Sequence, residues 1–196
     1  GRKLPEVLEI EEIDALLAAI DLSAAEGERN HAMLETLYSC GLRVSELIGL
    51  RFSDLYFDEG FIRVIGKGNK ERLVPVSPQV VQEITTYTAQ SRLEVPIKKG
   101  HEHFIFLNRR GAALTRVMIF TIIKQLAQKI GLGKQISPHT FRHSFATHLV
   151  EGGANLRAVQ EMLGHESITT TEIYTHLDQR FLRKAILSHH PRNQGK

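Results

Sequence analysis

Residues 137–149 read Ser-Pro-His-Thr-Phe-Arg-His-Ser-Phe-Ala-Thr-His-Leu, and this stretch carries the clearest fold signal in the chain. Proline is well placed in the first turn of a helix, so Pro138 predicts a helix start. Apolar side chains recur at helical spacing at Phe141, Phe145 and Leu149. We therefore expect a helix with one face packed against a core.

The same helix is expected to carry a basic face. His139, Arg142 and His143 lie three and four residues apart, so they share one side of the helix. The free backbone amides at a helix N-terminus also attract anions. This pattern is compatible with a phosphate site, although a surface helix with scattered basic residues would look the same.

A zinc site is an alternative for this helix. His139 and His143 are four residues apart, as in helical zinc pairs, and His148 follows. However, no cysteine ligand lies nearby, no glutamate is in place to act as a base, and an arginine beside the site would repel a cation. The phosphate interpretation is therefore favoured.

The rest of the chain predicts a mainly α protein with a small three-stranded antiparallel β-sheet, an α+β fold. Gly41 is expected to end a helix, and Thr115 and Asn155 to start one. The expected helices cover about 9–20, 28–39, 43–50, 78–92, 115–130, 137–151, 155–164, a segment with Tyr174, and 179–188, and the expected strands 55–57, 61–65 and 72–76.

Composition narrows the classes of function. The chain has 196 residues, which suits one domain, and its single cysteine, Cys40, points to a reducing compartment such as the cytoplasm. No apolar run approaches the roughly 18 residues of a membrane span. The net charge of +3 permits a polyanionic partner without demanding one.

Two upstream motifs add basic groups. Arg43 stands three residues before Glu46, either as a local ion pair or as a second guanidinium for a phosphate that Glu46 orients. Lys67 is expected at a hairpin tip, Gly66-Lys67-Gly68-Asn69. This tip lacks the spacing of a nucleotide-binding loop and has strands on both sides, so a nucleotide site is not expected there.

A tyrosine completes the set. His165 follows Gly164 at a predicted helix end, and Tyr174 follows nine residues later. A free tyrosine has a pKa of about 10, so a tyrosine nucleophile needs a positive field or a proton acceptor. Arginines and imidazoles that converge on the phenol would supply both.

Together these motifs resemble the tyrosine recombinase (phage integrase) family, in its Xer-type branch, over essentially the whole chain. The matching segments are Gly41-Leu-Arg43-Val-Ser-Glu46-Leu, Gly66-Lys67-Gly68-Asn-Lys-Glu-Arg72-Leu-Val-Pro75, His139-Thr-Phe-Arg142-His143, Leu163-Gly164-His165 and Ile173-Tyr174-Thr-His176.

The resemblance implies site-specific DNA recombination. By it, Arg43 and Arg142 bind the scissile phosphate, Lys67 is the general acid, and Tyr174 is the nucleophile that forms a 3′-phosphotyrosyl link. His139 and His165 bond to the phosphate and manage the proton of the nucleophile. Lys70, Arg72 and His143 are further candidates for DNA contacts, and Glu46 supports Arg43. Because the bond energy stays in the covalent intermediate, the chemistry requires no metal, cofactor or ATP.

The resemblance also implies a domain plan. Residues 1–196 would form the catalytic domain, without the separate N-terminal core-binding domain of the family. Residues 177–196 would form a C-terminal helix and tail, docked on a neighbouring subunit or on the same domain. The partner would be double-stranded DNA, bound by a homo- or hetero-tetramer of the full-length protein, with no membrane. The alternatives are a tyrosine-type topoisomerase and a catalytically silent DNA-binding regulator.

Overall fold

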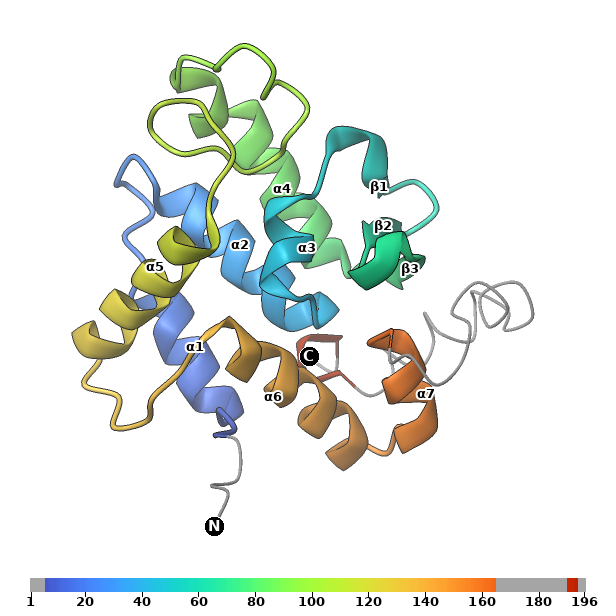
Figure 1. Cartoon of the computed structure of the whole chain (residues 1–196). Helices are drawn as coiled ribbons and strands as arrows, with labels where there is room; N and C mark the ends of the chain where they lie inside the picture. The colour runs from blue at the N-terminus through green and yellow to red at the C-terminus, as the bar shows by residue number, and fades with distance from the viewer. Residues whose placement is uncertain (1–5, 165–189, 194–196) are drawn as a thin grey trace.

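Helices make up most of the computed structural model, which describes residues 6–164 and 190–193 (Figure 1). The helices are α1 (Ile10–Ala18), α2 (Gly27–Cys40), α3 (Val44–Ile48), α4 (Pro78–Ala89), α5 (Arg116–Lys129), α6 (Pro138–Glu151) and α7 (Leu156–Met162). The strands are β1 (Leu55–Tyr56), β2 (Phe61–Ile65) and β3 (Glu71–Pro75), in one antiparallel sheet of order β1-β2-β3. The predicted fold class is confirmed.

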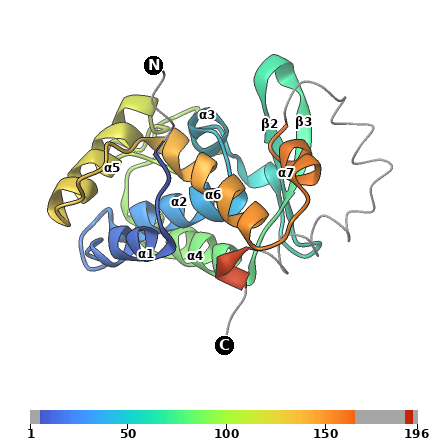
Figure 2. The same ribbon diagram turned by 90° about the horizontal axis from the view of Figure 1, so that it is seen from below.

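Helix α2 is the centre of the core. It packs against α1, α3, α4 and α6, and the views in Figures 1 and 2 place it between these neighbours. Because it has neighbours on several sides, Met33, Leu34, Leu37 and Tyr38 are all almost completely buried. The same position also buries the polar side chains of Glu35, Thr36 and Ser39.

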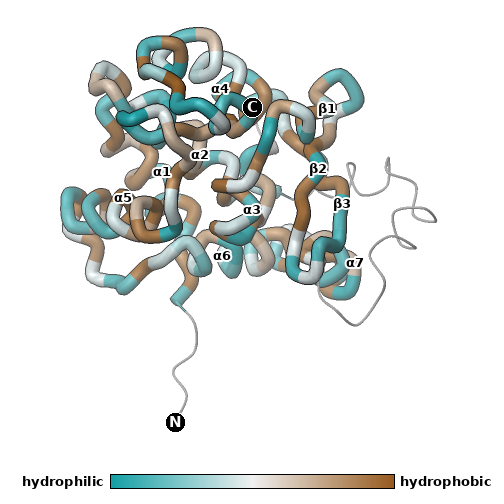
Figure 3. Tube along the Cα trace, turned by 45° about the horizontal axis from the view of Figure 1, so that its top comes forward, coloured by the Kyte–Doolittle hydropathy of each residue, from teal (hydrophilic) through white to brown (hydrophobic). Residues whose placement is uncertain are grey.

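The outer helices are amphipathic. Figure 3 shows hydrophobic and hydrophilic positions alternating along them, as expected for helices with one face in the core. On α6 the predicted stripe of Phe141, Phe145 and Leu149 is buried, at 1%, 1% and 0% exposure. The helix predicted from residues 137–149 is therefore confirmed, together with its buried face.

The predicted helix ends are confirmed at three positions. Gly41 follows α2 with a left-handed backbone (φ 63°), and its amide donates to the carbonyl of Leu37. The side chain of Thr115 accepts from the amide of Met118, and that of Asn155 caps α7. These caps satisfy backbone groups that have no partner within the helix.

One predicted helix is shorter than expected. The segment 78–92 was expected to be continuous, but α4 ends at Ala89 and a 3-10 turn follows at Ser91–Glu94. The reason is Arg92, which turns inward and donates to the carbonyls of Ile105 and Phe104. A tertiary contact thus overrides the local helical pattern. The helices expected around Tyr174 and over 179–188 lie outside the described residues.

The β2–β3 hairpin ends in a tight turn. Phe61 pairs with Pro75 and Ile65 with Glu71, and the turn Lys67–Asn69 joins the strands. Gly68 and Asn69 have positive φ angles of 73° and 58°. Glycine and asparagine tolerate this conformation best, so the sequence of the tip fits its geometry.

The described part of the tail packs on its own chain. His190 is fully buried, with its ring 4.7 Å from the ring of Tyr38 and 5.4 Å from that of Phe145. Arg192 forms ion pairs with Asp14 and Glu35. Residues 190–193 therefore contact α1, α2 and α6 of the same chain. Within the described ranges, no helix combines the length and hydrophobicity that a bilayer span needs.

Gly41 should tolerate no side chain. A Cβ atom there would lie 2.3 Å from the ring of Phe145, and the backbone is left-handed. We expect Gly41→Ala to lower the free energy of unfolding by about 2–4 kcal/mol, from overpacking added to backbone strain. Gly131→Ala is the matched control, because Gly131 has a similar φ of 66° but open space around it. In urea unfolding, Gly131→Ala should lower the free energy of unfolding by only about 1 kcal/mol. Equal losses of stability in the two variants would contradict this account.

His190 should make stability depend on pH. Burial, with the nearby charge of Arg192, lowers the pKa of His190 to about 3, whereas an unfolded histidine titrates near ~6.5. Below pH ~6.5 the unfolded chain therefore binds more protons, and stability falls until about pH 3. The titration of His190 alone should lower the free energy of unfolding by about 2 kcal/mol between pH 7 and pH 5. Urea unfolding of His190→Phe should show a correspondingly flatter pH profile, and parallel profiles would refute the assignment.

Candidate active site

A cleft of about 880 Å³ opens between α3, the β2–β3 hairpin, α5, α6 and α7. Five residues singled out in the sequence line it: Arg43, Lys67, His139, Arg142 and His143. They come from segments as far as a hundred residues apart. The fold therefore gathers most of the predicted basic groups in one place.

Arg43 enters the cleft from the start of α3. The left-handed turn at Gly41 reverses the chain after α2, and Arg43 then takes the N-cap position of α3. Its backbone amide donates to Glu46 Oε1 at 2.8 Å, and its guanidinium lies 3.4 Å from Glu46 Oε2. The side chain is 35% exposed, so the guanidinium remains accessible from the cleft.

Arg142 lies deeper, on α6, and is held by two carbonyl groups. It donates to the carbonyl of Gly41 at 2.9 Å and to that of Leu163. Burial and the neighbouring charges of Arg43 and Arg72 lower its pKa to about 9. The guanidinium is therefore charged at neutral pH, and a bound anion would stabilise that charge further.

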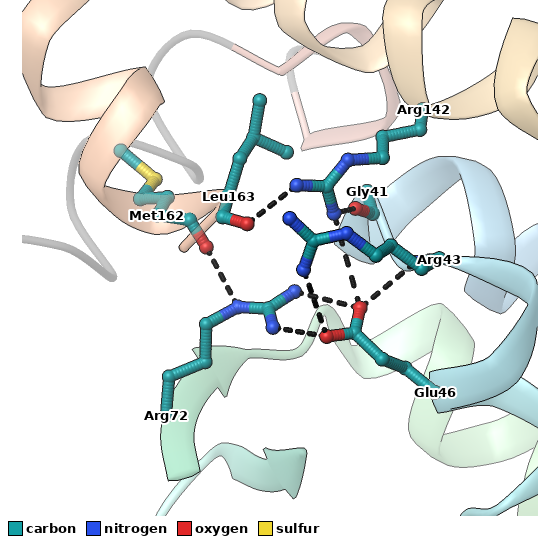
Figure 4. Close-up of polar contacts among 7 residues, drawn as sticks. All are labelled: Gly41, Arg43, Glu46, Arg72, Arg142, Met162 and Leu163. Atoms are coloured by element: carbon teal, nitrogen blue, oxygen red, sulfur yellow. Dashed lines mark hydrogen bonds and ion pairs between the residues drawn. The ribbon is translucent and has the colours of Figure 1, made fainter. Parts of the chain in front are cut away.

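Glu46 joins the arginines into one cluster (Figure 4). Its carboxylate has no exposed surface, forms a two-point ion pair with Arg72, and lies 3.8 Å from Arg142. Burial by itself would raise the pKa of Glu46, but hydrogen bonds and charge from Arg72, the amide of Arg43 and the charge of Arg142 hold it below its ordinary value. Glu46 is therefore ionised, accepts hydrogen bonds from Arg43 and Arg72, and faces the charge of Arg142.

The cluster has an excess of positive charge. Arg43, Arg72 and Arg142 surround the single carboxylate of Glu46. Arg43 and Arg142 line the cleft, whereas Arg72 and Glu46 do not. Guanidinium groups bind phosphate oxygens in two-point geometry, so this arrangement suits a phosphate-type anion.

The hairpin tip reaches the same cleft. Lys67 is exposed and lines it, and a Cβ atom on Gly66 would lie 3.1 Å from Glu46 Oε2. The start of the tip, at Gly66, therefore lies against the arginine cluster, and Lys67 beside it brings an ammonium group to the cleft. Lys70 is exposed just beyond the tip and is not among the residues that line the cleft.

The histidines of α6 separate into two groups. His139 is exposed and His143 half-buried, and both line the cleft. His148 instead lies buried, and its Nδ1 is 2.7 Å from the hydroxyl of Tyr38. The three-histidine zinc set considered for this helix is therefore not assembled, and no group of metal-ligating side chains converges in 6–164 and 190–193.

Arg72 does not lie where a DNA contact would. It was a candidate for such a contact, but only 4% of it is exposed and its guanidinium is engaged by Glu46 and the carbonyl of Met162. The surrounding helices cover it, so it cannot reach a phosphate backbone in this structure. We correct its expected role to an internal one.

Sequence reasoning missed part of the cleft. Arg116 and Phe120 of α5 line it beside the predicted residues. Thr115 predicted the start of this helix, but no spacing in the sequence connected the helix to the other motifs. His165 and Tyr174 lie outside the described residues.

Comparison with known proteins identifies relatives of one kind. The family model described as "Phage integrase family" matches residues 6–180. Tyrosine recombinase XerD of Halalkalibacterium halodurans is 47% identical over 191 residues, and XerD of Staphylococcus epidermidis is 49% identical. Each alignment covers 97% of this chain, and the chain spans only 64% of the length of these curated relatives.

Solved structures give the same result. XerA recombinase is 33% identical with a TM-score of 0.73, and the match covers 97% of this chain and 67% of the other. XerH site-specific recombinase, in a pre-cleavage complex with its difH substrate, is 31% identical with a TM-score of 0.73. That match covers 91% of this chain and 52% of the other.

The cluster should bind inorganic phosphate. At matched ionic strength, phosphate should raise the melting temperature of the wild-type protein more than chloride does, because a bound anion stabilises the folded state. Arg43→Ala should lose most of this gain while it remains folded, since the Arg43 side chain is 35% exposed. Arg63→Ala is the control, because Arg63 pairs with Asp54 outside the cleft. If phosphate raises the melting temperature of both variants as much as that of the wild type, it binds elsewhere.

Proposed function

Because this chain belongs to the phage integrase family, we propose that it is a site-specific DNA recombinase that cleaves and rejoins strands through a tyrosine. One observation carries the proposal. Arg43, Arg142, Lys67 and His139 line a single cleft, with the buried carboxylate of Glu46 behind the two arginines. This set supplies positive charge, a proton donor and an imidazole to one phosphodiester.

The arginines would stabilise the transition state. Phosphoryl transfer places negative charge on the non-bridging oxygens, and fixed guanidinium groups meet it with paired hydrogen bonds. Arg142 is held by the carbonyls of Gly41 and Leu163, so its position is set before substrate binds. Such preorganised donors contribute roughly 3–4 kcal/mol each to lowering the barrier.

The proposed step balances without an external co-reactant. The oxygen of Tyr174 attacks phosphorus, and the bond between phosphorus and the 5′ oxygen breaks. His139 or His165 takes the phenol proton, and Lys67 delivers a proton to the leaving 5′ oxygen. The strand then remains linked through a 3′-phosphotyrosyl ester. A 5′ hydroxyl of a partner strand reverses the step, so one ester bond is lost and one is gained at each stage.

Double-stranded DNA is the proposed substrate. The similar XerH recombinase was solved with its difH substrate, and a Tn1549 transposon integrase that is 27% identical to this chain was solved with circular intermediate DNA. The positive cluster suits the same backbone. We further propose that the full-length protein acts as a tetramer on DNA in the cytoplasm, with Lys70 and His143 contacting the duplex.

The proposal predicts a covalent protein–DNA adduct. The wild-type protein, incubated with nicked duplexes of randomised sequence around the nick, should give a band that survives denaturing electrophoresis. The band should persist in EDTA, because no metal takes part. Tyr174→Phe should bind the same duplexes within about twofold of wild type and form no adduct, since only the nucleophilic oxygen is removed.

Two outcomes would contradict the proposal. An adduct of undiminished yield in Tyr174→Phe would remove the tyrosine from its role. An absence of wild-type adduct with intact DNA binding would favour the silent regulator instead. Exchange of strands between two labelled duplexes separates recombination from the relaxation of supercoils that a topoisomerase would perform.

A further inference from the structure

We propose that Arg72 is a positioning residue for strand cleavage, acting through Glu46 and the last turn of α7 rather than on DNA. The inference rests on the proposed function, because its readout is the rate of that reaction. Arg72 stands on β3 opposite Val64 of β2, and its side chain is almost wholly buried. It is therefore placed inside the domain, beneath the cleft.

The first contact of Arg72 is with the carboxylate of Glu46. One terminal nitrogen pairs with Oε2 and the other donates to Oε1 at 2.9 Å, so both oxygens are engaged in a plane. This two-point geometry fixes the orientation of the carboxylate. The same oxygens accept from Arg43 and lie 3.8 Å from Arg142, so the orientation of Glu46 sets the contact with Arg43 and the negative charge that faces Arg142.

The second effect of Arg72 concerns charge. A buried carboxylate requires positive partners, since leaving it unpaired is costly. If Arg72 were absent, Glu46 would have only Arg43 and Arg142 to pair with, and both would be drawn from the cleft toward it. Arg72 pairs with the carboxylate from the side away from the cleft. Arg43 and Arg142 therefore remain available to bind a phosphate.

The third contact reaches α7. Arg72 Nε donates to the carbonyl of Met162 at 3.0 Å, and Arg142 donates to the carbonyl of the next residue, Leu163. Gly164 follows with a left-handed backbone, and a Cβ atom there would lie 3.2 Å from the Arg72 side chain. Two arginines from β3 and α6 thus hold the end of α7 against the cluster.

Only a guanidinium can make both kinds of contact. Its terminal nitrogens reach Glu46 while Nε points to Met162, in directions set by one planar group. A lysine keeps the charge but offers one nitrogen atom. Arg72→Lys therefore removes the positioning function and still leaves Glu46 with a positive partner.

The test separates rate from binding. The probe is the nicked duplex that the wild-type protein links most efficiently. With Arg72→Lys, the rate of adduct formation at saturating DNA should fall by about tenfold or more. The dissociation constant for the duplex should stay within about twofold, because a buried side chain makes no DNA contact. Weaker binding with an unchanged saturating rate would overturn the proposal and restore Arg72 as a DNA contact.

Arg63→Lys is the matched control. Arg63 stands on the adjacent strand β2 and contacts one oxygen of the buried carboxylate of Asp54 through two nitrogens, away from the cleft and with 31% of its side chain exposed. Both variants should have a lower melting temperature than the wild type. Only Arg72→Lys should form the adduct more slowly at saturating DNA. If the two variants slow the reaction equally at a temperature where both are folded, Arg72 is merely structural and the proposal is wrong.

A double-mutant cycle tests whether Arg72 acts through Glu46. Arg72→Met and Glu46→Gln should each slow the reaction, and the double variant should be no slower than the slower single variant. The double variant leaves no buried carboxylate without a cation, and Arg142 keeps its two carbonyl partners. It can therefore be measured even if Arg72→Met does not fold, and its rate is then compared with that of Glu46→Gln alone. If the two substitutions reduce the rate of adduct formation independently, so that their effects multiply, Arg72 acts by another route. The same holds if the double variant reacts much more slowly than Glu46→Gln.

These outcomes are separate from those of the proposed function. If the wild-type protein forms no adduct, the proposed function fails and the cycle has no readout. If the wild-type protein forms the adduct and Arg72→Lys matches its saturating rate, the proposed function stands and the role of Arg72 is refuted.

Discussion

The buried carboxylate of Glu46 is the constraint on which the site depends. A charge with no exposed surface is stable only among opposite charges and donors. Here it is met by Arg43 from α3, Arg72 from β3 and Arg142 from α6. The three guanidinium groups that pair with this carboxylate therefore lie close together. Their charge exceeds that of the carboxylate, so the cluster can also bind an anion.

The core and the site share one structural junction, the end of α2. Gly41 lies against the ring of Phe145, so it sets how closely α2 and α6 approach. Its carbonyl also accepts from Arg142, and two residues later Arg43 takes the N-cap position of α3. Packing of the central helix thus places both cleft arginines, and a change in that packing would be transmitted to the site.

The sequence predicted local structure well and burial less well. Within the described residues, the helix ends at Thr115 and Gly41 and the hairpin were correct because they depend on neighbouring residues, whereas the helix expected over 78–92 stops at Ala89. Arg72 was misjudged because a charged residue in a strand is normally on the solvent side. In the structure it faces inward while Glu71, its neighbour, is exposed. The partner that permits this burial, Glu46, is distant in the chain.

Residue spacing by itself determined the elements, the basic face of α6 and the set of groups capable of phosphate chemistry. Only the tertiary structure decided which of these groups meet. It turned His148 toward Tyr38, brought Arg116 into the cleft and placed Arg72 beneath it. The physical reason is range: hydrogen bonds within a helix or turn are read from adjacent residues, whereas the pairing of buried charges depends on contacts between segments far apart in sequence.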